Sequence, residues 1–291
     1  MKLKAASLWQ NLTKGAQNAL EIARVGRLSP EVHAPYTVVR RERIYKLRHY
    51  AKQDTAIKLD TALLLVPPLM VTPEVYDIDP PISAIRMLEN QGVDVWVVDF
   101  GIPEQEEGGL ARTLDDHVRA VDHAIDQVRS ATGRDVHLAG YSQGGMFCYQ
   151  VAAYRHGAGI KSLITFGAPV DLHRNSALKD ELATRVIDTL SGMTRSMLQA
   201  MEGLPGAFSS IGFRVLSMKK ELKSMVGFVS HLHDREALMR GESSRRFLHG
   251  EGFVYWPGPA LRTFFEEFVV DNRLSQGGFV VDGRSLTLAD I

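Results

Sequence analysis

The feature that most constrains this chain is the hexapeptide at residues 140–145, which reads Gly-Tyr-Ser-Gln-Gly-Gly. Residues 135–139 before it have the length and apolar content of a strand, and residues 146–153 carry apolar side chains at helical spacing. Gly-x-Ser-x-Gly on a sharp turn from strand to helix strains the serine backbone and holds its hydroxyl clear of the sheet. We therefore predict that Ser142 is a nucleophile at the positive end of a helix dipole. The alternative is a glycine-rich turn whose serine only caps the helix.

The stretches around this turn alternate between strand and helix patterns. Strands are predicted at 62–66, 93–100 and 160–166, and helices at 81–92 and 114–132. This alternation predicts an α/β fold with right-handed crossovers and a mostly parallel sheet, in which reactive residues follow the carboxyl ends of the strands. Residues 37–50 are rich in β-branched, aromatic and arginine side chains, and they predict one or two edge strands.

Helical patterns occupy the first residues of the chain and a long stretch after the sheet strands. Over residues 3–25 the apolar side chains fall on one helical face, which consists of Leu8, Leu12, Ala16, Leu20 and Ala23. We expect this face to pack against the rest of the chain or a partner chain rather than a membrane. From 171 to 250 we find no strand signal. The methionines there, with Met193, Met197 and Met201 on one helix face, predict a helical cap over an apolar pocket, although plain core is the simpler interpretation of any single one.

The chain is expected to return to the core after the cap. A helix is predicted at 261–268 and a hairpin at 279–288, with Asp282-Gly283 at its turn. The predicted domain organisation is an N-terminal helical arm at 1–35, a core at 36–171, the cap at 172–250 and the return to the core at 251–291.

Composition excludes several classes of partner. Lys plus Arg and Asp plus Glu both number 34, so the net charge gives no reason to expect nucleic acid or an anionic membrane. The single cysteine, Cys148, permits no intrachain disulfide and fits a reducing compartment. No apolar run reaches transmembrane length, and the N-terminus lacks the apolar core of a signal peptide. We expect a cytoplasmic protein with no metal site and no cofactor.

Four stretches of the chain form a recognisable set, at residues 64–68, 92–101, 136–145 and 272–274. They resemble the polyhydroxyalkanoate synthase branch of the α/β-hydrolase superfamily, and the likeness runs from about residue 30 to the end. It looks closest to the hydrolase-like module that some bacteria join to an AMP-forming acyl-CoA ligase. The polymerising synthases carry Cys at the nucleophile position, where this chain has Ser142. The resemblance therefore implies an acyl hydrolase or acyltransferase of lipid metabolism, acting on a fatty acyl ester or thioester, rather than polyester synthesis as the main activity.

The resemblance also implies where the oxyanion of such a reaction is bound. One donor is the backbone N–H after the nucleophile, which belongs to Gln143. The second comes from the loop after the first buried strand; because Pro67 and Pro68 have no N–H, Leu69 or Met70 is the candidate.

The resemblance leaves the acid and base of the triad without residues. In the α/β-hydrolase order they follow the nucleophile, beyond a strand that would begin near residue 291. We expect the sheet to lack its last strands, the catalytic site to be incomplete, and the chain to form a homo-oligomer or pair with a C-terminal partner segment. A weaker alternative uses Asp171 as acid and His231 or His233 as base. The alternative function is a non-catalytic module that binds acyl chains or an acyl-CoA ligase.

Overall fold

The computed structural model describes residues 2–50, 62–174, 201–216 and 218–291. Within them, six strands form the main sheet in the order β1-β2-β4-β3-β5-β6. The strands are β1 (Thr37–Arg41), β2 (Lys46–Tyr50), β3 (Ala62–Val66), β4 (Asp94–Asp99), β5 (Val136–Tyr141) and β6 (Ile160–Phe166). β3 is parallel to β4 and β5, and β5 is parallel to β6, so the predicted parallel sheet is confirmed.

The first two strands depart in part from the prediction of edge strands. β1 lies at the edge of the sheet, but β2 lies between β1 and β4 and pairs antiparallel with both. Because β2 is internal, its Arg48 is buried, and it forms ion pairs with Asp99 at 2.8 Å and with Glu74 at 2.7 Å. The arginine-rich pattern therefore included one buried arginine that is paired with two carboxylates.

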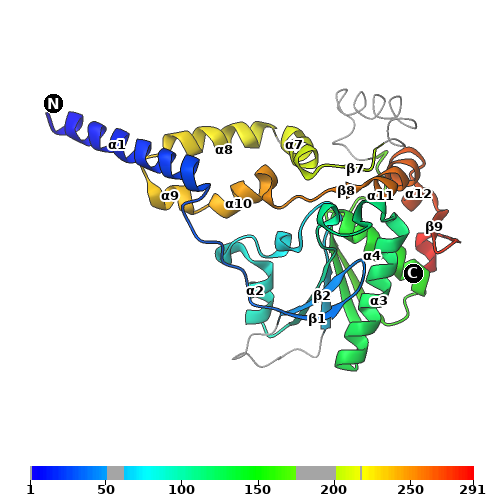
Figure 1. Ribbon diagram of the computed structural model, residues 1–291. Helices are drawn as coiled ribbons and strands as arrows, with labels where there is room; N and C mark the ends of the chain where they lie inside the picture. Colours follow the sequence, from blue (N-terminus) through cyan, green and yellow to red (C-terminus); the bar gives the residue numbers. More distant parts are fainter. Residues whose placement is uncertain (1, 51–61, 175–200, 217) are drawn as a thin grey trace.

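Helices cover both faces of the sheet (Figure 1). Helices α3 (Leu114–Thr132) and α4 (Gln143–Arg155) lie on one face, and α2 (Ala84–Asn90) lies on the other. The larger apolar core lies between the sheet and α3 and α4, and includes Leu64, Val121 and Phe147. A smaller core on the α2 side contains Ile85 and Val97.

The boundaries of α3 follow directly from the sequence. Thr113 accepts a hydrogen bond from the backbone N–H of Asp116, and the Asp116 carboxylate accepts one from the Thr113 N–H. This reciprocal capping box satisfies two donors at the start of the helix. Gly133, with a φ of 70°, ends it in the left-handed conformation.

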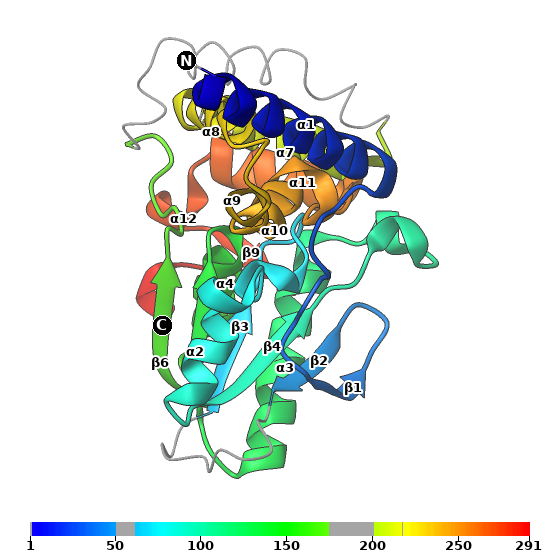
Figure 2. The same cartoon turned by 90° about the vertical axis from the view of Figure 1, so that its left-hand side faces the viewer.

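A second group of helices lies over the carboxyl ends of the strands (Figures 1 and 2). These cap helices are α7 (Gly206–Leu216), α8 (Met218–Ser230), α9 (Arg235–Met239), α10 (Glu242–Arg246) and the π-helix η6 (Phe247–Glu251). Met193 and Met197 lie outside the described residues. A short strand, β7 (Gly203–Leu204), pairs with β8 (Trp256–Pro257), so the expectation of no strand between 171 and 250 was wrong at this point.

The C-terminal residues pack beside α4 and α3. They form α11 (Gly258–Thr263), the π-helix η7 (Phe264–Val270), α12 (Arg273–Gln276), and a hairpin of β9 (Phe279–Val281) and β10 (Arg284–Leu286). The predicted hairpin is confirmed, and positive φ angles at Asp282 and Gly283 form its turn. It is a separate two-stranded sheet.

The N-terminal residues form a single long helix, α1 (Lys2–Val25), which lies against the cap helices at one end of the molecule (Figures 1 and 2). Among the described residues, no helix has both the length and the apolar character needed to cross a membrane.

Candidate functional site

Ser142 lies on the turn between β5 and α4, as the sequence predicted for this segment. Its φ of 52° and ψ of −122° are outside the usual regions for a residue with a side chain. Such a conformation costs about 1–3 kcal/mol and persists only where the surrounding structure enforces it. Ser142 occupies the N-cap position of α4, yet its side chain makes no capping hydrogen bond. The alternative in which this serine only caps the helix is therefore wrong, and this residue lies at the positive end of the helix dipole.

Two glycines allow α4 to start so close to the sheet. A Cβ on Gly140 would lie 2.5 Å from the backbone of Gly144 and Gly145. A Cβ on Gly144 would collide with the carbonyl oxygen of Val66 at the end of β3. Only residues without a side chain fit at these two positions, and the close approach holds the Ser142 turn against the loop that follows β3.

The two predicted oxyanion donors meet through a side chain that the sequence did not single out. The Leu69 backbone N–H donates to Oε1 of Gln143, with a distance of 3.2 Å between nitrogen and oxygen. The Gln143 side chain is buried, and its Nε2 has no hydrogen-bond partner among the residues that the structure describes. The Gln143 amide therefore occupies the Leu69 donor, and an incoming oxyanion would replace this bond with one to itself. The spacing of the motif gave no signal for this contact, because the two residues are 74 positions apart.

Tyr76 contacts the same turn from the other side of the sheet through its hydroxyl. Its hydroxyl donates to the carbonyl oxygen of Val66 at 2.7 Å and accepts from the backbone N–H of Tyr141 at 3.2 Å. Burial raises the pKa of the Tyr76 phenol well above its ordinary value, so the group remains a neutral donor. Tyr76 thus joins the end of β3 to the residue before Ser142, and it was not among the residues predicted from the sequence.

The loop after β3 is also tied to the segment that follows the cap. The carbonyl oxygen of Met70 accepts from the Val254 N–H at 3.1 Å, and the Thr72 N–H donates to Gly252 at 2.9 Å. Val71 and Phe253 form an antiparallel bridge between the same segments. We call the turn between β5 and α4, which carries Ser142, the elbow. The loop with the predicted donors Leu69 and Met70 is therefore held on one side by the elbow and on the other by residues 252–254.

Asp171 lies just beyond the end of β6, where its carboxylate is held by several donors. Oδ1 accepts from Nδ2 of Asn272 at 2.9 Å and from the backbone N–H groups of His173 and Arg174 at 3.1 Å each. The Asn272 hydrogen bond is the main reason that the pKa of Asp171 lies below its ordinary value. Asn272 also accepts from the Leu172 N–H at 3.1 Å, so this cluster joins the end of the sheet to α12.

The two candidate histidines lie on the turn between α8 and α9, against α1. His231 Nδ1 bonds to the carbonyl oxygen of Gly227 at 2.7 Å. A Cβ on Gly15 of α1 would lie 3.7 Å from the backbone nitrogen of His233. Figure 1 shows this turn at the α1 end of the molecule, whereas α4 begins under α11. The structure therefore does not bring Asp171, His231 and His233 together.

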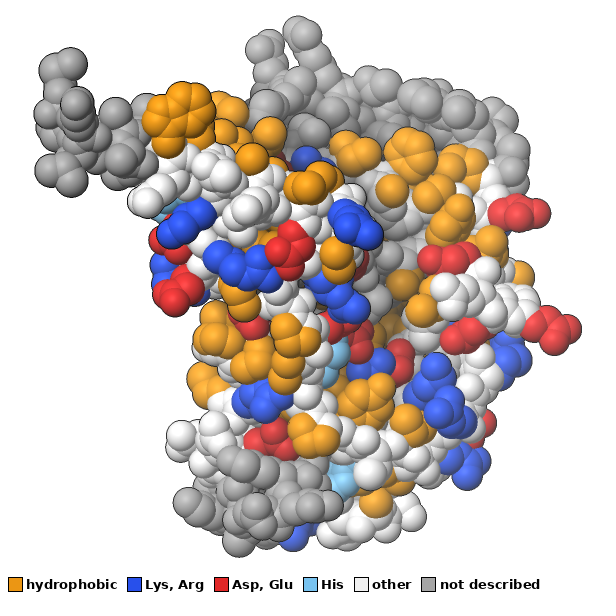
Figure 3. All heavy atoms as spheres, turned by 60° about the vertical axis from the view of Figure 1, so that its left-hand side comes forward, with side chains coloured by type: hydrophobic (Ala, Val, Ile, Leu, Met, Phe, Trp, Pro, Cys, Tyr) orange, Lys and Arg blue, Asp and Glu red, His pale blue; other side chains and the backbone are white. Residues whose placement is uncertain are grey.

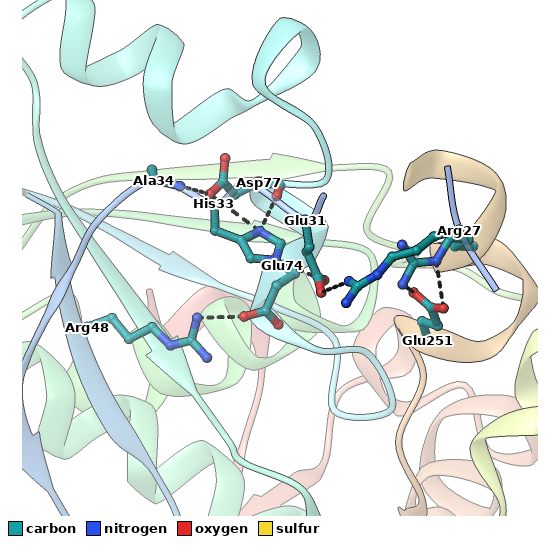
Figure 4. A network of polar contacts seen from close by, with 9 residues as sticks. Arg27, Glu31, His33, Ala34, Arg48, Glu74, Asp77 and Glu251 are labelled. Atoms are coloured by element: carbon teal, nitrogen blue, oxygen red, sulfur yellow. Dashed lines mark hydrogen bonds and ion pairs between the residues drawn. The ribbon is translucent and has the colours of Figure 1, made fainter. Parts of the chain in front are cut away.

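A separate polar cavity of about 220 Å³ lies between the N-terminal segment, the 3₁₀ helix η1 (Pro73–Tyr76) and the cap. Among the residues that line it, His33 contacts Glu31 through Nε2 at 3.0 Å, and Glu74 accepts a hydrogen bond from the neighbouring Arg48 at 2.7 Å (Figure 4). Burial disfavours the charged form of His33, but the neighbouring carboxylates outweigh it and raise its pKa. These charged side chains pair with one another between different segments of the chain. The residues that line the cavity do not include Ser142.

No protein-family model matches the chain. Curated proteins do match. The chain is 29% identical over 238 residues to the "Poly(3-hydroxyalkanoate) polymerase subunit PhaC" of Allochromatium vinosum, which covers 79% of this chain and 62% of that protein. It is 25% identical over 256 residues to the protein of the same name from Haloferax mediterranei, which covers 87% of this chain and 50% of that one. The chain thus spans about half to three-fifths of the length of these relatives.

Among solved structures, a soluble variant of monoglyceride lipase from Saccharomyces cerevisiae is similar with a TM-score of 0.38 and 14% identity, over 57% of this chain and 54% of that one.

Proposed function

We propose that this chain, which has an α/β-hydrolase fold and is similar in sequence to poly(3-hydroxyalkanoate) polymerase subunits, transfers acyl groups through Ser142. The observation that carries the proposal is the strained backbone of Ser142 at the start of α4, combined with a hydroxyl that makes no capping bond. A serine held in this way presents its oxygen to a ligand above the carboxyl ends of the strands.

The reaction begins when the Ser142 oxygen attacks an acyl carbonyl while its proton passes to a general base. The Gln143 N–H and the Leu69 N–H stabilise the oxyanion that forms, and the loss of one such donor typically costs about 3–4 kcal/mol of transition-state stabilisation. The bond from the carbonyl carbon to the leaving oxygen or sulfur then breaks, and the leaving group takes up a proton. Water or a hydroxyl acceptor releases the acyl group from Ser142, which gives hydrolysis or transfer respectively.

The proposed substrate is a fatty acyl ester or acyl thioester. The names of the relatives support an acyl substrate, since those proteins polymerise 3-hydroxyalkanoates. Leu69 and Met70 are both buried apolar residues beside the elbow, so the surroundings of the proposed oxyanion site suit an apolar acyl group rather than a charged one.

Labelling with a fluorophosphonate probe tests the proposal directly. We expect the wild-type protein to form one covalent adduct, which peptide mapping places on Ser142. Ser142→Ala should form no adduct and should lose turnover of both p-nitrophenyl esters and acyl-CoA thioesters. Its circular dichroism spectrum and melting temperature should stay close to those of wild type, because this side chain makes no capping bond.

A double variant, His231→Ala with His233→Ala, is the matched control for the base. We expect it to label at the wild-type rate, because these histidines lie beside α1. Equal labelling of wild type and Ser142→Ala would refute the assignment of the nucleophile. Loss of labelling in the double histidine variant alone would instead assign the base to the α8–α9 turn.

A further inference from the structure

Helix α1 packs on the molecule through its small and polar side. Asn18 is buried, and its Nδ2 donates to the carbonyl oxygen of Leu232 at 2.8 Å. Gly15, one turn earlier, lies against the same residue, where an added Cβ would be 3.6 Å from Leu232 Cβ. Glu21 forms an ion pair with Arg235 at 2.6 Å. Among the described side chains of α1, the two buried residues are therefore the small Gly15 and the polar Asn18, which is the reverse of an ordinary surface helix.

The apolar face of α1 points away from the molecule. Trp9 is 71% exposed, Leu12 is 59% exposed and Leu20 is 69% exposed. At 100° per residue these three positions fall within about 80° of one another, so they form one stripe along the helix. The sequence predicted that this face would pack against the rest of the chain or a partner chain, and within the described part of this chain the contacts use the other side.

Helix α8 has the same inverted arrangement. Its apolar residues recur at the i, i+3, i+4 and i+7 positions of one face and are all more than half exposed: Leu222, Met225, Val226 and Val229. Its acidic residue points inward instead, where Glu221 pairs with Arg214 at 2.9 Å and with His249 at 3.0 Å. Two helices that are far apart in sequence thus present an apolar face outward and pair their acidic residue with an arginine of the cap.

These faces lie at the same end of the molecule. Figures 1 and 2 both show α1 and α8 along the outer edge of the cap, on the side opposite the central sheet. Figure 3 shows apolar side chains gathered along this edge. Phe208 and Ile211 of the neighbouring helix α7 are also more than half exposed. We call this surface the outer cap face.

The outer cap face is basic, although the chain as a whole is neutral. Among the described side chains of α1 and α8, three exposed residues are basic, namely Lys14, Arg24 and Lys223, and the acidic residues are Glu21 and Glu221. Both glutamates form ion pairs with arginines. The balance of 34 basic and 34 acidic residues therefore hides a local excess of positive charge.

We propose that the outer cap face binds an anionic lipid surface, with α1 and α8 lying in the plane of the interface. Helices with a basic polar side and Trp and Leu on the other side bind membranes in this way, through buried apolar area and attraction to anionic headgroups. Tryptophan is enriched at the membrane–water interface, which suits Trp9. The proposal does not depend on the role of Ser142.

The charge of this face favours lipid over a second copy of the chain. A two-fold symmetric dimer places the same patch of both subunits together, so the exposed basic side chains Lys14, Arg24 and Lys223 would face the same basic side chains of the second subunit. An anionic lipid surface supplies the opposite sign, and each nearby Lys or Arg adds to the attraction. An apolar face with a basic excess is therefore better matched by lipid headgroups and acyl chains than by itself.

Vesicle binding tests the proposal with a built-in reporter. Of the three tryptophans, Trp96 and Trp256 are buried, so a fluorescence change on binding reports Trp9. We expect a blue shift and flotation with phosphatidylcholine vesicles that contain about 30 mol% phosphatidylglycerol, and little of either with phosphatidylcholine alone. Binding should weaken at an ionic strength of about 1 M, where the Debye length falls to about 3 Å.

Two double variants with the same charge change separate apolar burial from electrostatics. Leu12→Glu with Leu20→Glu alters the apolar stripe, whereas Gln10→Glu with Gln17→Glu alters exposed polar positions of the same helix. We expect the leucine variant to bind anionic vesicles at least about tenfold more weakly than the glutamine variant, because only the leucines are buried on binding. Equal weakening, no binding by the wild type, or a wild-type dimer that only the leucine variant converts to monomer would overturn the proposal.

Discussion

At the scale of single residues, His117 shows how a buried group makes stability depend on pH. It lies on α3 between Phe100 and Phe147, and its Nδ1 bonds to the Thr113 carbonyl oxygen at 2.6 Å. Within the described part of the chain, its Nε2 has no hydrogen-bond partner. Burial lowers its pKa from 6.5 to about 4. Because the pKa is lower in the folded state, the unfolded chain binds more protons, and the stabilisation by neutral His117 is present above pH 6.5 and is lost as the pH falls towards 4.

We predict that, as the pH falls from 6.5 to 4, protonation of His117 lowers the free energy of unfolding by about 3 kcal/mol. Denaturant unfolding at several pH values should show that His117→Leu has a shallower decrease than wild type over this range. His123→Leu, at an exposed position of the same helix, should retain the wild-type slope. Parallel slopes for wild type and His117→Leu would show that the histidine is not neutral in the folded protein.

At the scale of elements, the position of α4 against β3 decides the geometry of the elbow. We predict that Gly144→Ala destabilises the protein by about 1–3 kcal/mol, because the new methyl group meets the Val66 carbonyl and overpacked sites cost this much. It should also slow labelling of Ser142, since relief of the clash requires α4 to move from the loop after β3. Chemical denaturation and labelling rates measure the two effects.

Gly212→Ala is the matched control for this substitution. Gly212 is an exposed position within α7, and no atom of the described residues lies within 4 Å of an added Cβ. Alanine there should raise stability by about 0.5–1 kcal/mol, because glycine is unfavourable inside a helix. Similar stabilities for the two variants would mean that α4 can shift without cost.

At the scale of the whole molecule, Glu242 of α10 fastens the N-terminal segment to the cap. Its buried carboxylate accepts hydrogen bonds from the backbone N–H groups of Leu28 and Ser29, at 2.7 and 2.8 Å, and from the Ser29 hydroxyl at 2.5 Å. These residues are more than 200 positions apart in the chain. The arm formed by α1 is therefore connected to the rest of the protein chiefly through the cap.

We predict that Glu242→Ala costs about 1–3 kcal/mol, because two backbone donors lose their acceptor. Hydrogen exchange should accelerate at Leu28 and Ser29 and through α1, while the strands of the main sheet keep their protection. Glu236→Ala removes the same charge from an exposed position of the neighbouring helix α9 and should leave exchange in α1 unchanged. Unchanged exchange at Leu28 and Ser29 in Glu242→Ala would contradict this account.

The sequence by itself determined the local elements, because their signals lie within a few consecutive residues. The glycines around Ser142 fixed the turn between β5 and α4, Thr113 and Asp116 fixed the start of α3, and Asp282-Gly283 fixed the C-terminal hairpin. The apolar runs at 62–66 and 160–166 became strands for the same reason. The nucleophile was predicted from this local information and the oxyanion donors from the family resemblance, and their roles remain predictions.

Only the tertiary structure decided which side chains meet and which way each face points. The Gln143 side chain accepts a hydrogen bond from Leu69, which is 74 positions away in the sequence, and Tyr76 accepts one from Tyr141, which is 65 positions away. Sequence periodicity predicts no contact at such separations. Likewise, His231 and His233 lie against α1, a position that their place in the sequence did not indicate. Periodicity identified the apolar stripe of α1, but a stripe looks the same whether it faces core or solvent. Docking of the opposite side through Asn18 turned it outward, because that contact depends on the folded cap.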